Sequence, residues 1–430
     1  MSRYRLLLVL VKRRCLLTCK SRLLWALFLA VTILPALSAL VTSSSLTRRI
    51  AVQHASLNAL EDKLHDPNIH VYSQVFRVVS HPLPYGSIFF SGPSAAAPDL
   101  AVLHGRFGGT ELLSSDAATP FAAPRYLPLD PAHLLAFSIT LLGILYGAEI
   151  IAGEKEQGLL RLVLSLPVGR LDLLIAELTS VLIVLTIPVL LAIGLTAAAL
   201  SSLPVHYPVI WTLVGCYAPL PLLGLLFATA GIAVASCPLP HDGALALAFA
   251  VWAGLVLLGT PTSSGLGTAV QAGTNRSALS EGILARANPT QQAVLMSGAT
   301  PADFQDMCHL KATRLPVLPV LAYFRYVGGV TGTGTEAWKL YCGQIGRAEG
   351  ALNECIRREL TSEPDRAFRW TENSSSIACI EPAARPDAAP WQSGFSEMFS
   401  GIASLLIWNG AAFALARLLF ARMDVSRSGR

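Results

Sequence analysis

The chain has 430 residues, of which 53% are hydrophobic and only 14% are charged. Because soluble domains usually carry about 25% charged residues, this composition excludes an ordinary soluble protein and indicates a membrane protein. The net charge of +5 is modest, so we expect basic residues in membrane-flanking loops and no nucleic-acid partner.

Six apolar runs predict six membrane-spanning helices, because a helix of about 20 apolar residues crosses roughly 30 Å of hydrocarbon. The runs are residues 23–41, 132–152, 173–200, 209–235, 243–259 and 398–420. Pro188, Pro219 and Pro221 predict tilts or kinks in the third and fourth runs. A weaker apolar patch, Leu315–Val330, is assigned to a folded domain outside the membrane. The expected fold class is therefore a mainly α-helical membrane protein with a six-helix transmembrane bundle.

The first run also has two features of a cleaved signal peptide, a basic segment ahead of it and small residues at Ala36 and Ser38. The basic segment, residues 1–22, and the apolar run are both longer than those of an ordinary signal peptide. We therefore favour a retained membrane anchor that follows an amphipathic N-terminal segment.

The basic residues predict the orientation, because they gather in the short cytoplasmic flanks of membrane proteins. They lie in residues 1–22, in the break at 153–172 and in the tail at 421–430. An even number of spans puts all three segments on one side of the membrane. We therefore expect a multi-pass protein of the cytoplasmic, or inner, membrane with both termini in the cytoplasm.

Two long segments then lie outside the cytoplasm, residues 42–131 and 260–397. Apolar residues in the range 46–64 recur at helical spacing, so the first membrane helix is expected to continue outward. The stretch HVYSQVFRVV, residues 70–79, has the composition of a β-strand. We expect the two segments to form two extracytoplasmic domains, α/β or mostly α.

Four of the eight cysteines lie in the second of these segments, namely Cys308, Cys342, Cys355 and Cys379. An even set in an oxidising compartment favours two disulfides, for which three connectivities are possible. Four unpaired thiols are the alternative. A zinc site is disfavoured because no two of the four have the Cys-x-x-Cys spacing that such sites usually use.

The break between the second and third runs, GEKEQGLLRLVLSLPVGR (Gly153–Arg170), predicts a short amphipathic helix. Leu159, Leu162, Val163 and Leu166 recur at three- and four-residue steps, and charged residues fill many of the other positions. Such a helix lies at the headgroup boundary and directs its charged face to the cytoplasm. The residues alone leave two interpretations open, a plain connector and a docking element for a cytoplasmic partner.

The longer stretch YGAEIIAGEKEQGLLRLVLSLPVGRLDLL resembles the segment after the second span of type-2 ABC export permeases. Their pattern is E-(R/K)-E-x-G-T-L-x-L-L-L-S-x-P-(V/L)-x-R. The matching positions are Glu154, Lys155, Glu156, Gly158, Leu160, Leu162, Leu164, Ser165, Pro167, Val168 and Arg170. Leu159 stands where Thr is usual, and Ala176 and Glu177 stand where Gly and Lys are common.

The arrangement of the chain also resembles one subgroup of these permeases. Large segments after the first and fifth spans are similar to those of permeases related to nitrous oxide reductase maturation and gliding motility. The stretch RANPTQQAV is similar to an Asn-Pro motif of that subgroup, which is a weaker match.

The resemblance implies the transmembrane permease subunit of an ABC transporter, which moves a substrate with the help of a separate ATPase subunit. It also implies a dimer with a second permease copy, identical or paralogous, surrounded by membrane lipid. The break would be the coupling helix that docks in the ATPase, with the residues Glu154, Lys155, Glu156, Gly158, Leu160, Arg161, Leu164, Ser165, Pro167 and Arg170. The sequence has no G-x-x-x-x-G-K-[ST] loop, so we expect ATP and Mg on the partner and no cofactor bound directly. By itself the chain is not expected to be an enzyme.

Three polar residues lie in or near the predicted spans, namely Glu149, Glu177 and Asn409. Carboxylates within hydrocarbon are costly and are functional candidates by default. For the two glutamates we weigh three roles, of which interfacial anchoring is favoured over pairing with Arg161 or Arg170 and over substrate contact. For Asn409 we expect an interhelical hydrogen bond.

Neither a metal site nor a catalytic set is expected. His65 and His70, with Asp62 and Asp66, have suitable chemistry for a metal, but a solvated helix end explains them as well.

Two hypotheses compete with transport. In the first, the subunit only transmits ATPase-driven movement to an extracytoplasmic partner, which the size of the two outer segments favours. In the second, the spans anchor an outer enzyme or sensor, which the lack of a catalytic set disfavours.

Overall fold

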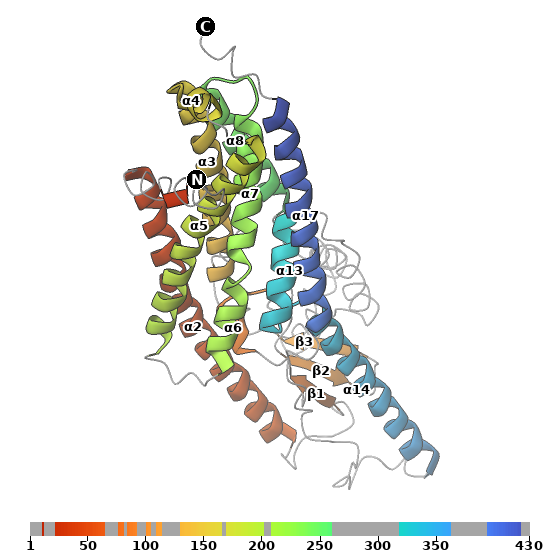
Figure 1. The fold of residues 1–430 in the computed structure, drawn as a ribbon. Coiled ribbons are helices and arrows are strands. Elements are labelled where there is room, and N and C mark those ends of the chain that lie inside the picture. The colour runs from red at the N-terminus through yellow and green to blue at the C-terminus, as the bar shows by residue number, and fades with distance from the viewer. Residues whose placement is uncertain are drawn as a thin grey trace, which may run out of the picture.

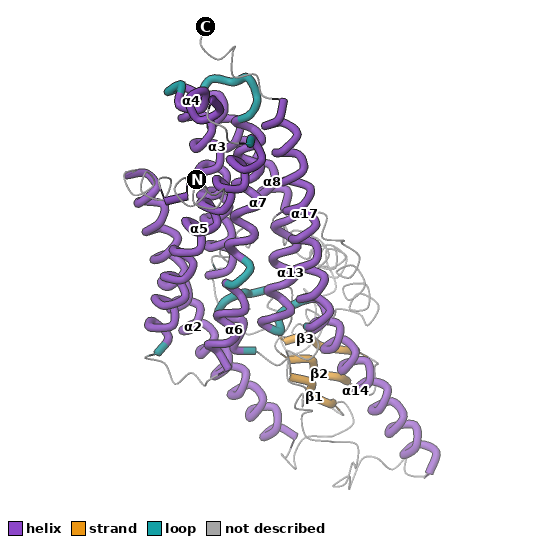
Figure 2. The backbone as a smooth tube through the Cα atoms, in the orientation of Figure 1, coloured by secondary structure: helices purple, strands orange, loops and turns teal. Residues whose placement is uncertain are grey.

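The computed structural model describes residues 11–12, 22–64, 76–80, 84–92, 100–104, 109–113, 130–165, 169–201, 208–259, 318–362 and 394–422. These residues form an elongated bundle of helices with a small sheet near one end (Figures 1 and 2). The opposite end carries the short helix α4, Leu159–Ser165 (Figure 1). We call the two ends of the bundle the sheet end and the α4 end.

Five helices in the described part of the chain are long and apolar enough to cross a membrane. They are α2, Arg22–Leu64; α3, Pro131–Glu156; α5, Arg170–Leu200; the consecutive pair α6, Pro208–Tyr217, and α7, Leu220–Ala235; and α17, Phe395–Arg422. The remaining predicted run forms α8, His241–Gly259, whose described apolar part is shorter. The prediction of a mainly helical membrane protein is therefore confirmed, and five of the six predicted spans reach this length.

The first predicted span continues far beyond the length that a membrane requires. Helix α2 has 43 residues and is therefore about 65 Å long, against roughly 30 Å of hydrocarbon. This confirms that the first span continues as a helix.

At the sheet end lie β1, Phe76–Ser80, β2, Leu100–His104, and β3, Gly109–Leu113, which form an antiparallel sheet in that order. In its register Phe76 pairs with His104, and Leu100 pairs with Leu113.

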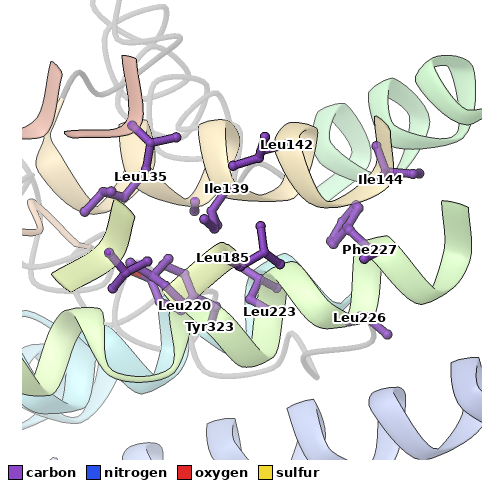
Figure 3. Packing of buried hydrophobic residues seen from close by; sticks show 14 of the residues in the cluster. Leu135, Ile139, Leu142, Ile144, Leu185, Leu220, Leu223, Leu226, Phe227 and Tyr323 are labelled. Atoms are coloured by element: carbon purple, nitrogen blue, oxygen red, sulfur yellow. The ribbon is translucent and has the colours of Figure 1, made fainter. Parts of the chain in front are cut away.

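Helices α3 and α7 form the centre of the bundle and are buried over most of their length. Figure 3 shows apolar side chains of the two helices facing one another, among them Leu135, Ile139, Leu223 and Phe227. Glycine lets the two backbones approach closely, because a Cβ atom at Gly147 would overlap with the backbone oxygen of Ala228. The helix pair therefore depends on the absence of a side chain at this position.

Replacing Gly147 by alanine is expected to lower the free energy of unfolding by about 2 kcal/mol, because overpacking forces the two backbones apart. Gly194→Ala in α5 is the matched control, since a Cβ atom there has no other atom within 4 Å and alanine favours a helix. Denaturant titration of the purified protein in mixed micelles measures both values. Equal stability of the two variants would contradict the close contact between α3 and α7.

The apolar patch Leu315–Val330, which we assigned to an outer domain, instead packs among the helices of the bundle. It forms α13, Pro319–Thr331, which lies mainly against α17 and also contacts α6, α7 and α8. Its 13 residues extend about 20 Å, too short to cross the membrane. The physical reason for its position is that large apolar side chains such as Tyr323 and Phe324 are buried only by packing on the spans.

The kink predicted for the fourth run is confirmed. Helix α6 ends at Tyr217 and α7 begins at Leu220, with Pro219 between them. Proline has no N–H and therefore interrupts the hydrogen bonds of a helix. The hydroxyl group of Tyr323 on α13 donates to the backbone oxygen of Cys216 beside this break, at 3.3 Å. Helix α13 thus supplies a hydrogen bond where the span is interrupted.

Candidate functional site

The predicted coupling segment lies at the α4 end and consists of two helix ends with a short helix between them (Figure 1). Helix α3 continues through Glu156, so the charged residues of the motif form its last turn. Gly158 then has a φ angle of +69°, a left-handed conformation that favours glycine and that ends helices. The amphipathic helix predicted from Gly153 is therefore divided at Gly158, and α4 follows as a separate element.

Helix α4 has one face against the bundle and one face exposed. Leu160 and Val163 are buried, whereas Leu162 is 66% exposed. Gly158 and Ser165 are also exposed. The result is a small outward surface that combines one apolar side chain with polar neighbours at the tip of the molecule.

The structure divides the predicted coupling residues into different groups. Glu156 faces outward with a side chain that is 69% exposed, whereas Glu154 is only 7% exposed. Leu160 is fully buried and fixes α4 to the bundle. Arg161 and Leu164 belong to α4, but their side chains are not among those described, and Pro167 lies outside the described residues.

Lys155 binds a turn that connects two other helices. Its Nζ atom donates to the backbone oxygen of Cys237 at 2.9 Å and to that of Leu239 at 3.3 Å. Both carbonyl groups lie between the end of α7 and the start of α8. A cation that donates to both carbonyl groups therefore holds the turn against the last turn of α3.

Arg170 makes the same kind of contact with a third helix. It is the first residue of α5, and its Nη1 atom donates to the backbone oxygen of Ala421 at 2.6 Å and to that of Phe420 at 3.4 Å. Those residues form the last turn of α17. The two cations of the motif therefore bring the ends of α7, α8 and α17 together beside α4.

His241, a residue that the sequence did not single out, joins this region as the first residue of α8. Its Nε2 atom lies 3.5 Å from Oε2 of Glu149, and its Nδ1 atom lies 4.0 Å from Oε2 of Glu156. The side chain near Glu149 is thus a histidine from α8, a helix that is far from Glu149 in the sequence but packs against α3. Glu177 is 2% exposed, so its side chain is directed into the bundle.

The interhelical hydrogen bond expected of Asn409 is confirmed. Its Nδ2 atom donates to the backbone oxygen of Leu222 on α7 at 3.2 Å, and to that of Leu405 on its own helix at 2.9 Å. This contact joins α17 to the central helix α7 in the middle of the bundle. It gives Asn409 a packing role between two spans.

The cysteines of the predicted disulfides are described only in part. Cys342 and Cys355 lie on α14, Thr335–Ser362, whereas Cys308 and Cys379 lie outside the described residues. Thirteen positions along one helix separate the first pair by about 20 Å, but a disulfide requires Cα atoms within about 7 Å. The structure therefore excludes a bond between Cys342 and Cys355, which removes one of the three connectivities.

A second polar cluster, which sequence reasoning missed, lies at the sheet end and centres on Asp130. This residue caps α3, and its Oδ1 atom accepts from the backbone N–H of His133 at 2.9 Å and lies 2.7 Å from Nδ1 of His133. Its Oδ2 atom accepts from the backbone N–H of Ser91 at 2.9 Å and from the Ser91 hydroxyl at 2.6 Å. Burial would raise the pKa of Asp130, but the charge of His133 and the hydrogen bonds from His133 and Ser91 outweigh it and lower the pKa. A Pro-flanked aspartate before an apolar run was the sequence signal for this cap.

A third contact at the sheet end joins a span to α14. Glu397, at the start of α17, accepts hydrogen bonds from the backbone N–H of Thr335 at 2.9 Å and from that of Glu336 at 3.2 Å, and it also accepts from the Thr335 hydroxyl. The Glu397 carboxylate thus caps α14, and it is 1% exposed. Figure 1 shows α14 extending away from the bundle at this point.

No group of three or more metal-binding side chains occurs among the residues that the structure describes. His65, Asp66 and His70, which we considered for a metal, lie outside them, and the side chain of Asp62 is not described. The described polar side chains instead bind backbone groups and neighbouring helices.

The chain was compared with protein-family models. A family model described as ABC-2 family transporter protein matches residues 17–425, which is nearly the whole chain. Among curated proteins, none matches the chain.

Proposed function

The chain is a member of the ABC-2 family of transporter proteins, and we propose that it is the permease subunit of an ABC transporter. The family implies an ABC ATPase as a partner. ATP and Mg would bind to that partner, because this sequence has no phosphate-binding G-x-x-x-x-G-K-[ST] loop. Nucleotide can drive a rearrangement of the spans only if the complex has two states with different affinities for it.

The site that couples the two subunits is, in this proposal, the outward surface at the α4 end. We call it the docking surface and define it as Glu156, Gly158 and Leu162. The observation that carries the proposal is that buried Leu160 and Val163 fix α4 to the bundle while Leu162 stays 66% exposed. A partner groove that receives α4 would bury this leucine and gain free energy from it.

The proposal places the α4 end in the cytoplasm and the sheet end outside the inner membrane, as the basic flanks of the spans suggest. Helix α8 then completes a set of six spans, and both termini lie in the cytoplasm. Residues 42–131, and residues 260–397 apart from the bundle helix α13, form two extracytoplasmic domains, as in the subgroup related to nitrous oxide reductase maturation and gliding motility. A second permease copy, identical or paralogous, completes the transporter.

The outer domain at 260–397 is proposed to contain two disulfides. Because Cys342 and Cys355 cannot bond to each other, each would pair with one of Cys308 and Cys379. Both remaining connectivities tie α14 to segments on either side of it in the sequence. Mass spectrometry of peptides from the unreduced protein distinguishes the two.

Leu162→Asp is expected to weaken binding of the ATPase, because it removes the apolar side chain that the partner would bury. The loss of about 2 kcal/mol corresponds to a roughly 30-fold lower affinity. The permease is purified from its native host, the co-purifying ATPase is identified by its phosphate-binding loop, and the affinity of the recombinant pair is then measured in nanodiscs.

Leu340→Asp serves as the matched control, because Leu340 is another exposed leucine, 44% exposed, on α14 near the sheet end. This variant should bind the ATPase with unchanged affinity. If no ATPase co-purifies, or if both variants bind as the unmodified protein does, the docking surface is assigned wrongly.

A second candidate function, transmission of movement without transport, is supported by one observation. Glu397 joins α17 directly to α14, so that movement of a span is passed to an element outside the bundle. Vesicles that contain the purified complex separate the two functions. Sustained ATP-dependent flux of a solute excludes pure transmission, whereas ATP hydrolysis that changes an outer partner without any flux excludes transport.

A further inference from the structure

The two cations of the coupling motif, Lys155 and Arg170, bind parts of this chain, whereas the side chains of the docking surface project outward. Glu156 and Leu162 are exposed side chains at the tip of the molecule. Lys155, which is half-buried, and Arg170, which is exposed, differ from them in that their donor atoms bind backbone carbonyl groups of the α7–α8 turn and of α17. Residues that belong to one sequence motif therefore divide into two groups with different surroundings.

The positions of the two cations bracket α4. Lys155 lies in the last turn of α3, before α4, and Arg170 begins α5, after it. The first holds the turn between α7 and α8, and the second holds the last turn of α17. The helix ends on both sides of α4 are thus each bound to another part of the bundle.

The chemistry of the contacts suits a permanent link. The acceptor in each contact is a neutral carbonyl group, so the contact does not depend on the protonation of a second side chain. For Arg170 the acceptors also lie at the C-terminus of α17, where a cation is favoured. In each case the partner is main chain, so the contact fixes the position of a helix end and not merely of a side chain.

We propose that Lys155 and Arg170 are positioning residues that fasten α4 to the α7–α8 turn and to α17, so that movement of α4 is passed to these helices. The proposal rests on the function proposed above and deepens it, because it assigns transmission and docking to different residues of the same motif. The alternative is that both cations contact acidic groups of the ATPase directly.

The test uses Lys155→Met and Arg170→Met, which keep an apolar stem and remove the donors. Lys155→Arg and Arg170→Lys, which retain donors, are the rescue variants. Spin labels are introduced on non-canonical residues at Ser165 on α4, Asp242 on α8 and Arg422 on α17, all of which are exposed. The distances from Ser165 to the other two labels are measured in nanodiscs, with the permease alone and with the ATPase in nucleotide-free and ATP-trapped states.

We expect a selective result. Lys155→Met should broaden the distribution of the Ser165–Asp242 distance and leave the Ser165–Arg422 distance unchanged, and Arg170→Met should do the reverse. In the complex, the ATP-dependent change of the affected distance should be lost, while the affinity for the ATPase stays within about twofold of the unmodified value. The rescue variants should restore the narrow distributions.

Two results would overturn the proposal. One is a loss of ATPase affinity of about tenfold or more with both distance distributions unchanged, which would place the cations in the subunit interface. The other is a set of distances that neither variant alters. If the unmodified permease binds no ATPase, the function proposed above fails, but the distances in the permease alone still decide whether the two cations fasten α4.

Discussion

Replacing Asp130 by alanine is expected to lower the free energy of unfolding by about 4 kcal/mol, the largest loss that we predict for a single substitution. The carboxylate is 2% exposed and accepts hydrogen bonds from groups of both Ser91 and His133. Without it, the partly buried donors of Ser91 and the buried ones of His133 lose their acceptor. His133, which is 3% exposed, also loses its only nearby charge partner among the described residues. Denaturant titration in mixed micelles measures the loss.

Two further variants show whether the carboxylate itself is responsible. Asp130→Asn keeps one acceptor oxygen but presents an NH₂ group to Ser91 or His133, so we expect a loss of about 2 kcal/mol. Asp242→Asn, at an exposed aspartate in the first turn of α8, should change the stability by no more than about 0.5 kcal/mol. An Asp130→Ala protein as stable as the Asp242 control would contradict the buried network.

The same network predicts a dependence on pH. The pKa of Asp130 in the folded protein lies below its ordinary value of 3.8, because His133 and Ser91 favour the ionised form. A carboxyl group with a lowered pKa stabilises the fold at pH values above its unfolded pKa, and this contribution is lost as the pH falls through the folded pKa. The difference in stability between the unmodified protein and Asp130→Asn should therefore shrink as the pH is lowered from 5 towards 3, a range around the ordinary aspartate pKa of 3.8. A difference that grows with acidity would contradict the assignment.

Glu397→Ala is expected to release the first turn of α14 from α17. The variant leaves the backbone N–H groups of Thr335 and Glu336 without the carboxylate that accepts from them. Loss of a cap of this kind costs about 1–2 kcal/mol, and about 1.4 kcal/mol corresponds to tenfold faster hydrogen exchange where exchange follows local opening. We therefore expect about tenfold faster exchange of the amides at the start of α14, measured by mass spectrometry of the protein in nanodiscs.

The control for this experiment is Lys339→Ala in the same turn region. Lys339 forms an exposed ion pair with Glu336 at 2.8 Å, and exposed pairs contribute little, about 0–1 kcal/mol. Its removal should leave exchange at the start of α14 nearly unchanged. Equal acceleration in both variants would show that Glu397 has no special part in holding α14.

Helix α17 connects the sheet end, where Glu397 lies, to the α4 end, where Arg170 lies. Its first turn holds α14 through Glu397, and its last turn accepts the hydrogen bonds of Arg170. Its 28 residues extend about 42 Å, so a single rigid element joins the α4 end to the sheet end. Asn409 ties the middle of the same helix to α7. Both proposed functions need a connection of this kind between the ATPase side and the outer segments.

The sequence by itself determined the membrane class, the positions of the long apolar helices and the location of the charged break. These features depend on composition and on local spacing, because an apolar run of about 20 residues has few alternatives to a membrane helix. The proline break between α6 and α7 and the continuation of α2 follow from equally local causes. The short helix after Gly158 is predicted for the same reason, although it starts six residues later, at Leu159, than the prediction from Gly153.

Only the tertiary structure decided which side chains meet. The backbone acceptor of Lys155 is 82 residues away and that of Arg170 is 251 residues away, and no pattern in the sequence relates them. The same holds for Tyr323 at the proline break and for Glu397 at the start of α14. An apolar stretch such as α13 has the same composition whether it packs inside an outer domain or against the spans. The position of α13 depends on which apolar surfaces of the long helices are still exposed after these helices have packed together. The spacing of residues along the chain carries no information about those surfaces.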